Sequence, residues 1–171
     1  MSQSTIGPAT VVTTTALTTI SYPKSRLSFY AVGRFWLFIV TSAGVLFTSS
    51  LDGISWATPT NVSSATTATT STYLAVFYEK YSNKVYYAVI DSTGATRKLY
   101  FRKGTPQSAG TISWDAAEQT VESIGDYSTY ILGVGATPAG IPCILYARDT
   151  GVGASVSVKV GKSSATAGTW V

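Results

Sequence analysis

The chain has no histidine, one cysteine and one methionine among its 171 residues. Without an imidazole, neither a Ser-His-Asp triad nor a Cys-His nucleophile can form, so Cys143 has no activating partner. Zinc and iron sites need His or paired Cys ligands, and a calcium site stays open without an Asp-rich loop to support it. We therefore expect no metal, no cofactor and no internal disulfide. The apolar neighbours of Cys143 predict a small buried side chain.

Charged side chains are also scarce, at 12% of the residues against roughly 25% in an average soluble protein. The 12 basic and 8 acidic residues are scattered without a Lys/Arg run, which argues against a nucleic-acid groove. The N-terminus lacks the pattern of a secretory signal, and the longest apolar stretch, around Phe35–Val40, is too short to span a bilayer. We expect a soluble chain without membrane insertion, whose compartment stays open, with the extracellular space and a virion surface among the candidates.

The rest of the composition is that of a β protein. Hydrophobic residues reach 45%, the polar residues are mostly Thr, Ser and Gly, and 11 Tyr favour pleated, half-buried surfaces. No segment has a sustained helical period with caps, so we expect an all-β fold. Short apolar runs between turn residues predict three sets of strands, at Phe29–Val32, Phe35–Val40 and Gly44–Ser49, at Tyr73–Tyr78, Lys84–Ile90 and Lys98–Lys103, and at Tyr130–Val134, Ile141–Ala147 and Ser155–Val160.

Three tryptophans mark an internal repeat. Trp56, Trp114 and Trp170 each follow a Gly-containing turn, and successive ones are 58 and 56 residues apart, about a third of the chain. A fourth strand is predicted after each of the first two. We therefore divide a single domain, residues 1–171, into three units of about 57 residues each, at 25–70, 71–126 and 127–171.

The third unit lacks an outer strand, because only Val171 follows its tryptophan, whereas residues 1–13 carry a spare one. Short four-stranded sheets must stack on neighbours, and radial stacks form propellers of typically 4 to 8 blades. Three blades are too few to close. We expect a β-propeller of three four-stranded blades per chain that closes to six blades as a homodimer, with the N-terminal strand completing a blade. A ring of more copies and a fragment of a longer propeller are the alternatives.

The residues from Ser50 to Trp56, Ser-Leu-Asp-Gly-Ile-Ser-Trp, resemble the Asp-box of sialidase-like propellers, whose pattern is Ser-x-Asp-x-Gly-x-x-Trp. This copy lacks the residue between Asp and Gly, and the other two units keep only the Gly and the Trp. The stretch 98–121 also looks like a blade of that family. The resemblance implies that the Asp holds the hairpin backbone and that each Trp packs into its blade, so the structural residues are Ser50, Asp52, Gly53, Trp56, Trp114 and Trp170.

The resemblance does not extend to the chemistry of that family. Sialidases hold their substrate with three arginines and use a Tyr–Glu pair and an Asp acid. The five arginines of this chain include none in the Arg-Ile-Pro context that marks the first of the three. Glycoside hydrolysis also needs two carboxyl groups, and Asp52 is committed to its turn. We therefore expect no enzymatic activity, and a sialidase-like hydrolase fragment is the least favoured reading.

Ligands of propellers usually bind on one face, which is opposite the Asp-box hairpins. The loops of that face hold much of the scarce charge together with aromatic rings, a combination that suits sugars, although loops collect charge in any case because they are solvated. The candidate ligand-binding residues are Tyr22, Arg26, Asp91, Arg97, Asp126, Tyr127, Arg148 and Asp149. The competing hypothesis is a structural part of a virion, fibre or extracellular filament. Against the glycan hypothesis, Tyr78, Tyr87 and Tyr146 do not share one position in the repeat.

Overall fold

The computed structural model describes residues 27–41, 44–63, 65, 74–91, 97–125, 129–149, 156–164 and 170. Within these ranges the chain is all-β, as the composition predicted. No described segment forms a helix long and apolar enough to cross a membrane. The strands are β1 Ser28–Ala31, β2 Arg34–Thr41, β3 Gly44–Ser50, β4 Thr60–Asn61, β5 Leu74–Glu79, β6 Lys84–Asp91, β7 Arg97–Pro106, β8 Ile112–Trp114, β9 Gln119–Gly125, β10 Thr129–Ala136, β11 Pro142–Asp149 and β12 Val156–Lys162.

These strands form three antiparallel sheets, none of which closes on itself. Sheet A has the order β1-β2-β3-β4, and sheet C has the order β10-β11-β12. Sheet B has the order β5-β6-β7, with both β8 and β9 paired to β7. Consecutive strands pair within each sheet, except that β9 pairs with β7 and not with β8. The strands of sheets A, B and C come from the first, second and third unit of the predicted repeat, respectively.

Every predicted first, second and third strand has a counterpart whose ends differ by a few residues. The fourth strand of the second unit differs more, because it was predicted to begin after Trp114. Trp114 instead ends β8, and the chain re-enters the ladder only at Gln119. Between Trp114 and Gln119, the side chain of Asp115 forms ion pairs with Lys84 and Lys103, and the backbone oxygen of Ala116 accepts a hydrogen bond from Arg102. This segment is therefore not part of the regular strand pairing.

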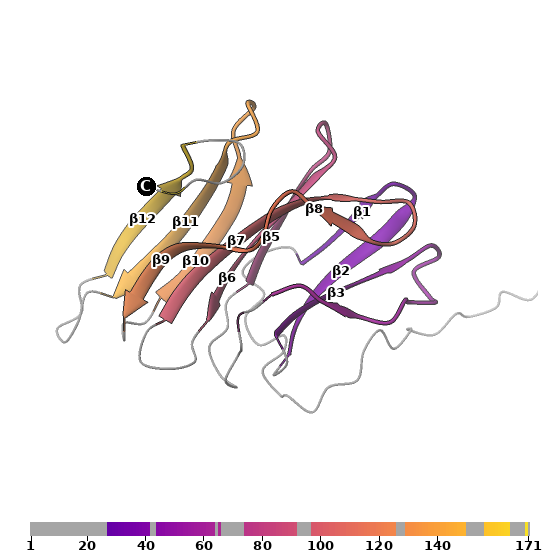
Figure 1. Ribbon diagram of the computed structural model, residues 1–171, viewed down its shortest axis with the longest axis horizontal. Coiled ribbons are helices and arrows are strands. Elements are labelled where there is room, and N and C mark those ends of the chain that lie inside the picture. The colour runs from indigo at the N-terminus through magenta and orange to yellow at the C-terminus, as the bar shows by residue number, and fades with distance from the viewer. Residues whose placement is uncertain are drawn as a thin grey trace, which may run out of the picture.

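The three sheets stack face to face in the order A, B, C (Figure 1). Alternate residues of a strand point to opposite faces, and β6 uses both. Val85, Tyr87 and Val89 pack with sheet A, whereas Tyr86, Ala88 and Ile90 pack with sheet C. All six of these side chains are buried. Sheet B is therefore the middle layer of the fold, and its second strand is a continuous apolar run for that reason.

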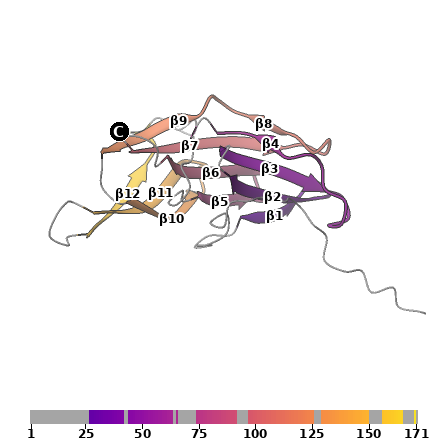
Figure 2. The same ribbon diagram turned by 90° about the horizontal axis from the view of Figure 1, so that it is seen from below.

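The layer between sheets A and B is aromatic. Trp36 is fully buried, and its indole N–H donates to the carbonyl oxygen of Ala31 at 3.1 Å, which satisfies the one polar atom of the ring. Phe38 lies 6.0 Å from Tyr87 across the layer, and Phe29 stacks on Tyr78 at 4.7 Å. In Figure 2 the first strands β1, β5 and β10 lie along the same side of the stack.

Sheets A and C each have one face on which no other described sheet packs, although the segment after β3 covers Thr48 and Ser50 on that face of sheet A. Cys143 lies on this outer face of sheet C, because its neighbour Ile144 points toward sheet B. The cysteine is half-buried, so the prediction of a buried side chain was wrong. The apolar neighbours that suggested burial include Leu145, which is itself exposed on the same face.

Candidate functional site

The turn from Ser50 to Trp56 is organised by two side chains. The carboxylate Oδ1 of Asp52 accepts hydrogen bonds from the backbone N–H groups of Ile54 at 2.8 Å and Ser55 at 2.7 Å. The hydroxyl of Ser50 donates to the same oxygen at 2.9 Å and accepts from the N–H of Gly53. Gly53 has a φ of +74°, a left-handed conformation that glycine adopts without a steric penalty.

These hydrogen bonds favour the ionised form of the Asp52 carboxyl group. Hydrogen bonds from Ser55, Ile54 and Ser50, in that order of importance, lower the pKa of its carboxyl group to about 2. Trp56 closes the turn, because its indole N–H donates to the carbonyl oxygen of Gly53 at 3.2 Å. The Oδ1 atom of Asp52 is therefore used to hold the turn, which is the structural role that the Asp-box resemblance implies.

The three repeat tryptophans pair with the end of the third strand of their own sheets. Trp56 bridges to Ser50, Trp114 pairs with Gly104, and Trp170 bridges to Ser163. A side chain at position 104 would collide with the indole, since a Cβ there would lie 2.7 Å from Trp114 Cε3. Trp56 and Trp170 form isolated bridges, whereas Trp114 belongs to the strand β8. All three lie at the same end of their sheets.

The candidate ligand-binding residues that the structure describes lie at the opposite end of the sheets. Asp91 ends β6 and Arg97 begins β7, at the lower edge of sheet B in Figure 1. Arg148 and Asp149 end β11 at the same edge, although only their backbones are described. The remaining candidates lie outside the described residues, as does the predicted closing strand within residues 1–13; these candidates are Tyr22, Arg26, Asp126 and Tyr127.

A polar cluster that the sequence did not suggest joins sheets A and B. The hydroxyl of Tyr87 donates to Glu118 Oε1 at 2.7 Å, and the hydroxyl of Ser63 donates to the same oxygen at 2.6 Å. The Arg102 guanidinium donates to the carbonyl oxygen of Val62 at 3.0 Å and lies 4.7 Å over the ring of Trp114. Burial, followed by the charge of Glu118, raises the pKa of Tyr87, which keeps its hydroxyl protonated as a donor.

A second tyrosine joins sheets B and C in the same way. Tyr146 lies on the second strand of sheet C, faces sheet B, and donates its hydroxyl to Glu122 Oε2 at 2.5 Å. Tyr87 lies on the second strand of sheet B, faces sheet A, and reaches the carbonyl oxygen of Val62 just after β4 at 2.9 Å. Tyr87 and Tyr146 thus hold equivalent positions, whereas Tyr78 lies on the first strand β5, so the three tyrosines do not share one position but two of them do. The alignment misses this because the loop before β11 is longer than the loop before β6.

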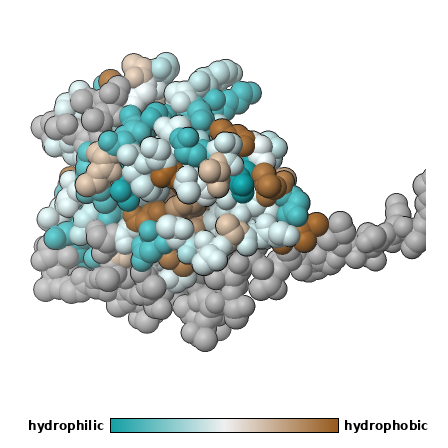
Figure 3. Space-filling model, turned by 45° about the vertical axis from the view of Figure 1, so that its right-hand side comes forward, coloured by the Kyte–Doolittle hydropathy of each residue, from teal (hydrophilic) through white to brown (hydrophobic). Residues whose placement is uncertain are grey.

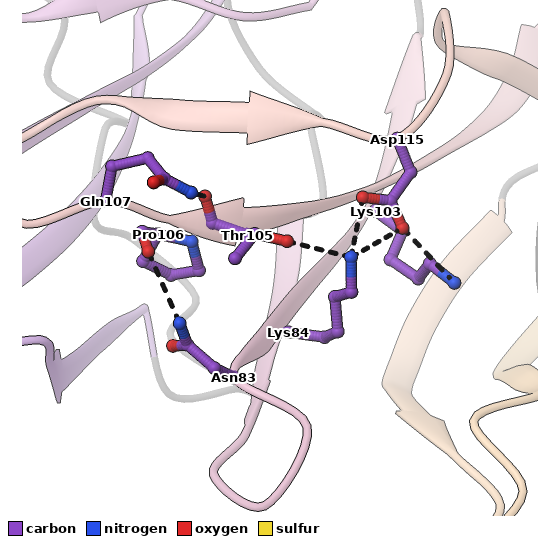
Figure 4. A network of polar contacts seen from close by, with 7 residues as sticks. All are labelled: Asn83, Lys84, Lys103, Thr105, Pro106, Gln107 and Asp115. Atoms are coloured by element: carbon purple, nitrogen blue, oxygen red, sulfur yellow. Dashed lines mark hydrogen bonds and ion pairs between the residues drawn. The ribbon is translucent and has the colours of Figure 1, made fainter.

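A third polar network lies where the β5–β6 turn meets β7 and β8 (Figure 4). Lys84 Nζ contacts both oxygens of Asp115, at 2.8 and 2.9 Å, and donates to Thr105 Oγ1 at 2.8 Å. Lys103 Nζ lies 3.4 Å from the same carboxylate. Two cations around one anion hold the end of sheet B together.

Five acidic side chains of the described residues are therefore bound to other groups of their own chain. Asp52 organises a turn, Asp115 pairs with lysines, and Glu118 and Glu122 accept tyrosine hydroxyls. Glu79 accepts from the backbone N–H groups of the turn that follows it. In the part of the chain that the structure describes, no three His, Cys, Asp or Glu residues come together as a metal site.

A groove of about 440 Å³ lies between β1 and β5, the first strands of sheets A and B. It is lined by Phe29, Tyr30 and Tyr78 and has the cationic Lys80 at one end. Aromatic faces with one charged group can hold a small ligand that is partly apolar. The groove forms where the first strands of two stacked sheets lie side by side, which no pattern within either strand indicates.

No family model, no curated protein and no solved structure matches this chain, so the interpretation of its sites rests on its own residues.

Proposed function

We propose that this chain is one half of a six-bladed β-propeller that closes with a second copy and acts as a non-enzymatic module that binds glycans. The observation that carries the proposal is the open stack. Sheets A, B and C pack face to face, and only sheet B has another described sheet packed on both faces. A short twisted sheet with one apolar face left uncovered needs a further neighbour.

The resemblance of the Ser50–Trp56 turn to an Asp-box supports the interpretation of the three sheets as propeller blades. The pairing of consecutive strands in each sheet, with the first strand on one side of the stack, suits a radial arrangement in which first strands line the centre. Six blades fall within the range that closes readily, whereas three do not. The N-terminal strand would complete the third blade of a neighbouring chain.

The absence of catalysis is supported by where the acidic groups are used. Acid–base work needs carboxyl groups that are free to exchange protons with a substrate. Asp52, Asp115 and Glu118 are instead held by backbone, lysine and hydroxyl groups of the chain itself. A histidine that would take their place is missing from the whole sequence.

Glycan binding is supported by the charged groups at one end of the sheets. Asp91 and Arg97 flank the β6–β7 connection, and a carboxylate beside a guanidinium offers an acceptor and several donors to sugar hydroxyls. Arg148 and Asp149 repeat this combination of residues at the end of β11. The recurrence in two units suits a module that presents more than one site.

A structural role is the second candidate, and one observation favours it. Tyr30, Phe35, Leu51 and Ile54 are exposed apolar residues on or beside sheet A. Figure 3, which brings that side of the molecule forward, shows hydrophobic atoms among the polar ones there. A chain that serves only as an assembly part of a virion, fibre or filament would present apolar surface and bind no small ligand.

Two measurements test the proposal. Light scattering on a sizing column should give the mass of two chains of 18.0 kDa, and deletion of residues 1–13 should lower that mass or cause aggregation. A glycan array should reveal binding that Arg97→Ala abolishes, whereas Lys80→Ala, at the opposite end of sheet B and beside the groove, should leave it intact. Loss of binding in the lysine variant alone would move the ligand to the groove, and no glycan binding at all would favour the structural candidate.

A further inference from the structure

The last strand of sheet C has its apolar residues on the side that faces away from the molecule. Val158 and Val160 are 64% and 68% exposed. The residues on either side of this pair, Ser157 and Gly161, belong to the face toward sheet B. A strand at the surface of a finished fold normally has the reverse pattern, with apolar residues inward and polar residues in water. The pattern of β12 is that of a strand whose outer face is covered.

The same pair of apolar residues occurs on the third strand of every sheet. Val45 and Phe47 on β3 are buried against sheet B, and Leu99 and Phe101 on β7 are buried against sheet C. Each pair points to the next sheet of the stack. Val158 and Val160 on β12 are the third such pair, and they point to where a fourth sheet would lie.

The rest of this surface is also apolar, and two of its positions are glycines without a side chain. Leu145, opposite Val160 on β11, is 39% exposed, and the lone thiol of Cys143 lies on the same face. Gly133 and Gly135 on β10 continue the face, and a Cβ built on either would meet no atom within 4 Å. The glycines leave open space on β10, separated from the valines by Leu145 and Cys143 on β11, into which bulky side chains can fit. We name this surface, formed by Gly133, Gly135, Cys143, Leu145, Val158 and Val160, the C face.

The opposite end of the stack carries bulky side chains. Tyr30 and Phe35 pack edge to face at 5.0 Å on the side of sheet A that points away from sheet B, and they are 59% and 43% exposed. Leu37 follows on the same face of β2. Sheets B and C each meet the preceding sheet through this same face of their second strand, by Tyr87 and by Tyr146. We name the surface of Tyr30, Phe35 and Leu37 the A face.

We propose that the C face of one chain packs on the A face of a second copy, so that the copies join head to tail through the contact already made twice inside each chain. The occupant is a second copy because sheet A packs on sheet B, and sheet B on sheet C, in this same way. At both junctions, side chains of the third strand of one sheet meet side chains of the second strand of the next sheet. The large rings of the A face would fill the space over Gly133 and Gly135. This inference rests on the proposed ring, and it adds which surfaces meet.

Head-to-tail pairing has a consequence that separates it from a symmetric contact. In a ring of two chains, both junctions contain one A face and one C face, so damage to either face breaks both junctions. If A faces met A faces and C faces met C faces, damage to one face would leave the other contact intact. The number of chains in the complex that each variant forms therefore distinguishes head-to-tail pairing from symmetric pairing.

The experiment uses the full-length chain with paired substitutions on each face. The C-face variant carries Val158→Glu and Val160→Glu, and the A-face variant carries Tyr30→Glu and Phe35→Glu. Tyr81→Glu, at an aromatic residue in the β5–β6 turn that is 92% exposed, is the matched control. Mass by light scattering, far-ultraviolet circular dichroism and the rate of Cys143 modification by a thiol reagent are measured for each.

Each face variant should keep its β spectrum and fall from the mass of two chains to that of one, while the control stays at two. An equimolar mixture of the two face variants should return to the mass of two chains, because one undamaged A face and one undamaged C face remain. Cys143 should react faster in the C-face variant than in the control. A wild-type chain of two-chain mass that either face variant leaves intact would overturn the face pairing and leave the ring standing. A monomeric wild type would overturn the ring itself.

Discussion

Removal of one hydroxyl group tests the polar link between sheets A and B. Tyr87 is fully buried, and Tyr87→Phe deletes the O–H that donates to Glu118 Oε1 at 2.7 Å while keeping the ring against Phe38 and Trp114. A hydrogen bond to a charged acceptor contributes about 1.5–3 kcal/mol. No acceptor is left alone, because Ser63 still donates to the same oxygen. We therefore expect a loss of about 1.5–3 kcal/mol in the free energy of unfolding.

Urea denaturation followed by tryptophan fluorescence measures this loss. Tyr78→Phe is the matched control, because the Tyr78 hydroxyl donates to a neutral acceptor, Asn83 Oδ1, at 3.0 Å in a half-buried position. The control should cost about 0.5–1.5 kcal/mol. A double-mutant cycle of Tyr87→Phe with Glu118→Gln should give a coupling energy above about 0.5 kcal/mol. If Tyr87→Phe leaves the free energy of unfolding unchanged, the hydroxyl does not stabilise the polar cluster around Glu118 and the reasoning is refuted.

Two further changes probe the repeat tryptophans and the turn. Gly104→Ala should destabilise the fold by about 1–3 kcal/mol in thermal denaturation, because its Cβ would lie 2.7 Å from Ile112 Cγ2; an unchanged midpoint would contradict the close approach of Trp114. The pKa of Asp52 falls from 3.8 to about 2 on folding, so its contribution is complete above pH 3.8 and lost as the pH falls toward 2. Asp52→Asn should therefore flatten the acid side of the stability profile, and equal slopes for variant and wild type would refute the turn's role.

Strand positions were predictable from the sequence because the hydrophobic pattern is strong where a sheet is buried on both sides. The run Lys84–Ile90 was read as a single strand, and it became β6, whose two faces serve two different cores. The pattern also separated the units, since Gly-containing turns before each tryptophan end a third strand. The start of the fourth strand was predicted wrongly after Trp114. The backbone N–H of Asp115 still donates to the carbonyl oxygen of Lys103, but regular pairing resumes only at Gln119, and no local pattern encodes the side-chain bonds of Asp115 and Arg102 in between.

The polar links between sheets were beyond sequence reasoning for a related reason. Tyr87 and Ser63 are 24 positions apart, and Tyr146 and Glu122 belong to different units. Their contacts depend on the stacking of sheets, not on spacing in the chain. The one available signal was the presence of a tyrosine on the second strand of two units, and a one-residue difference in the preceding loop hid it. Asp91 and Arg97 were correctly predicted to lie at the same end of sheet B, because both flank one loop. Their contacts could not be predicted from that position.

The internal junctions of the stack and the proposed junction between copies differ in one physical respect. Inside the chain, each junction combines apolar burial with a tyrosine hydroxyl that reaches the preceding sheet. On β2 the fourth residue is Leu37, whereas the fourth residue of β6 is Tyr87, so the A face has an apolar group where the internal junction has its polar link. A polar group on that face would be exposed in a free chain and would need a partner when buried, at a cost of about 1–3 kcal/mol if unpaired. An apolar residue carries no such requirement, which suits a surface that exists both free and joined. Under the proposed pairing, the chain would use directional bonds between its own sheets and non-directional burial between copies.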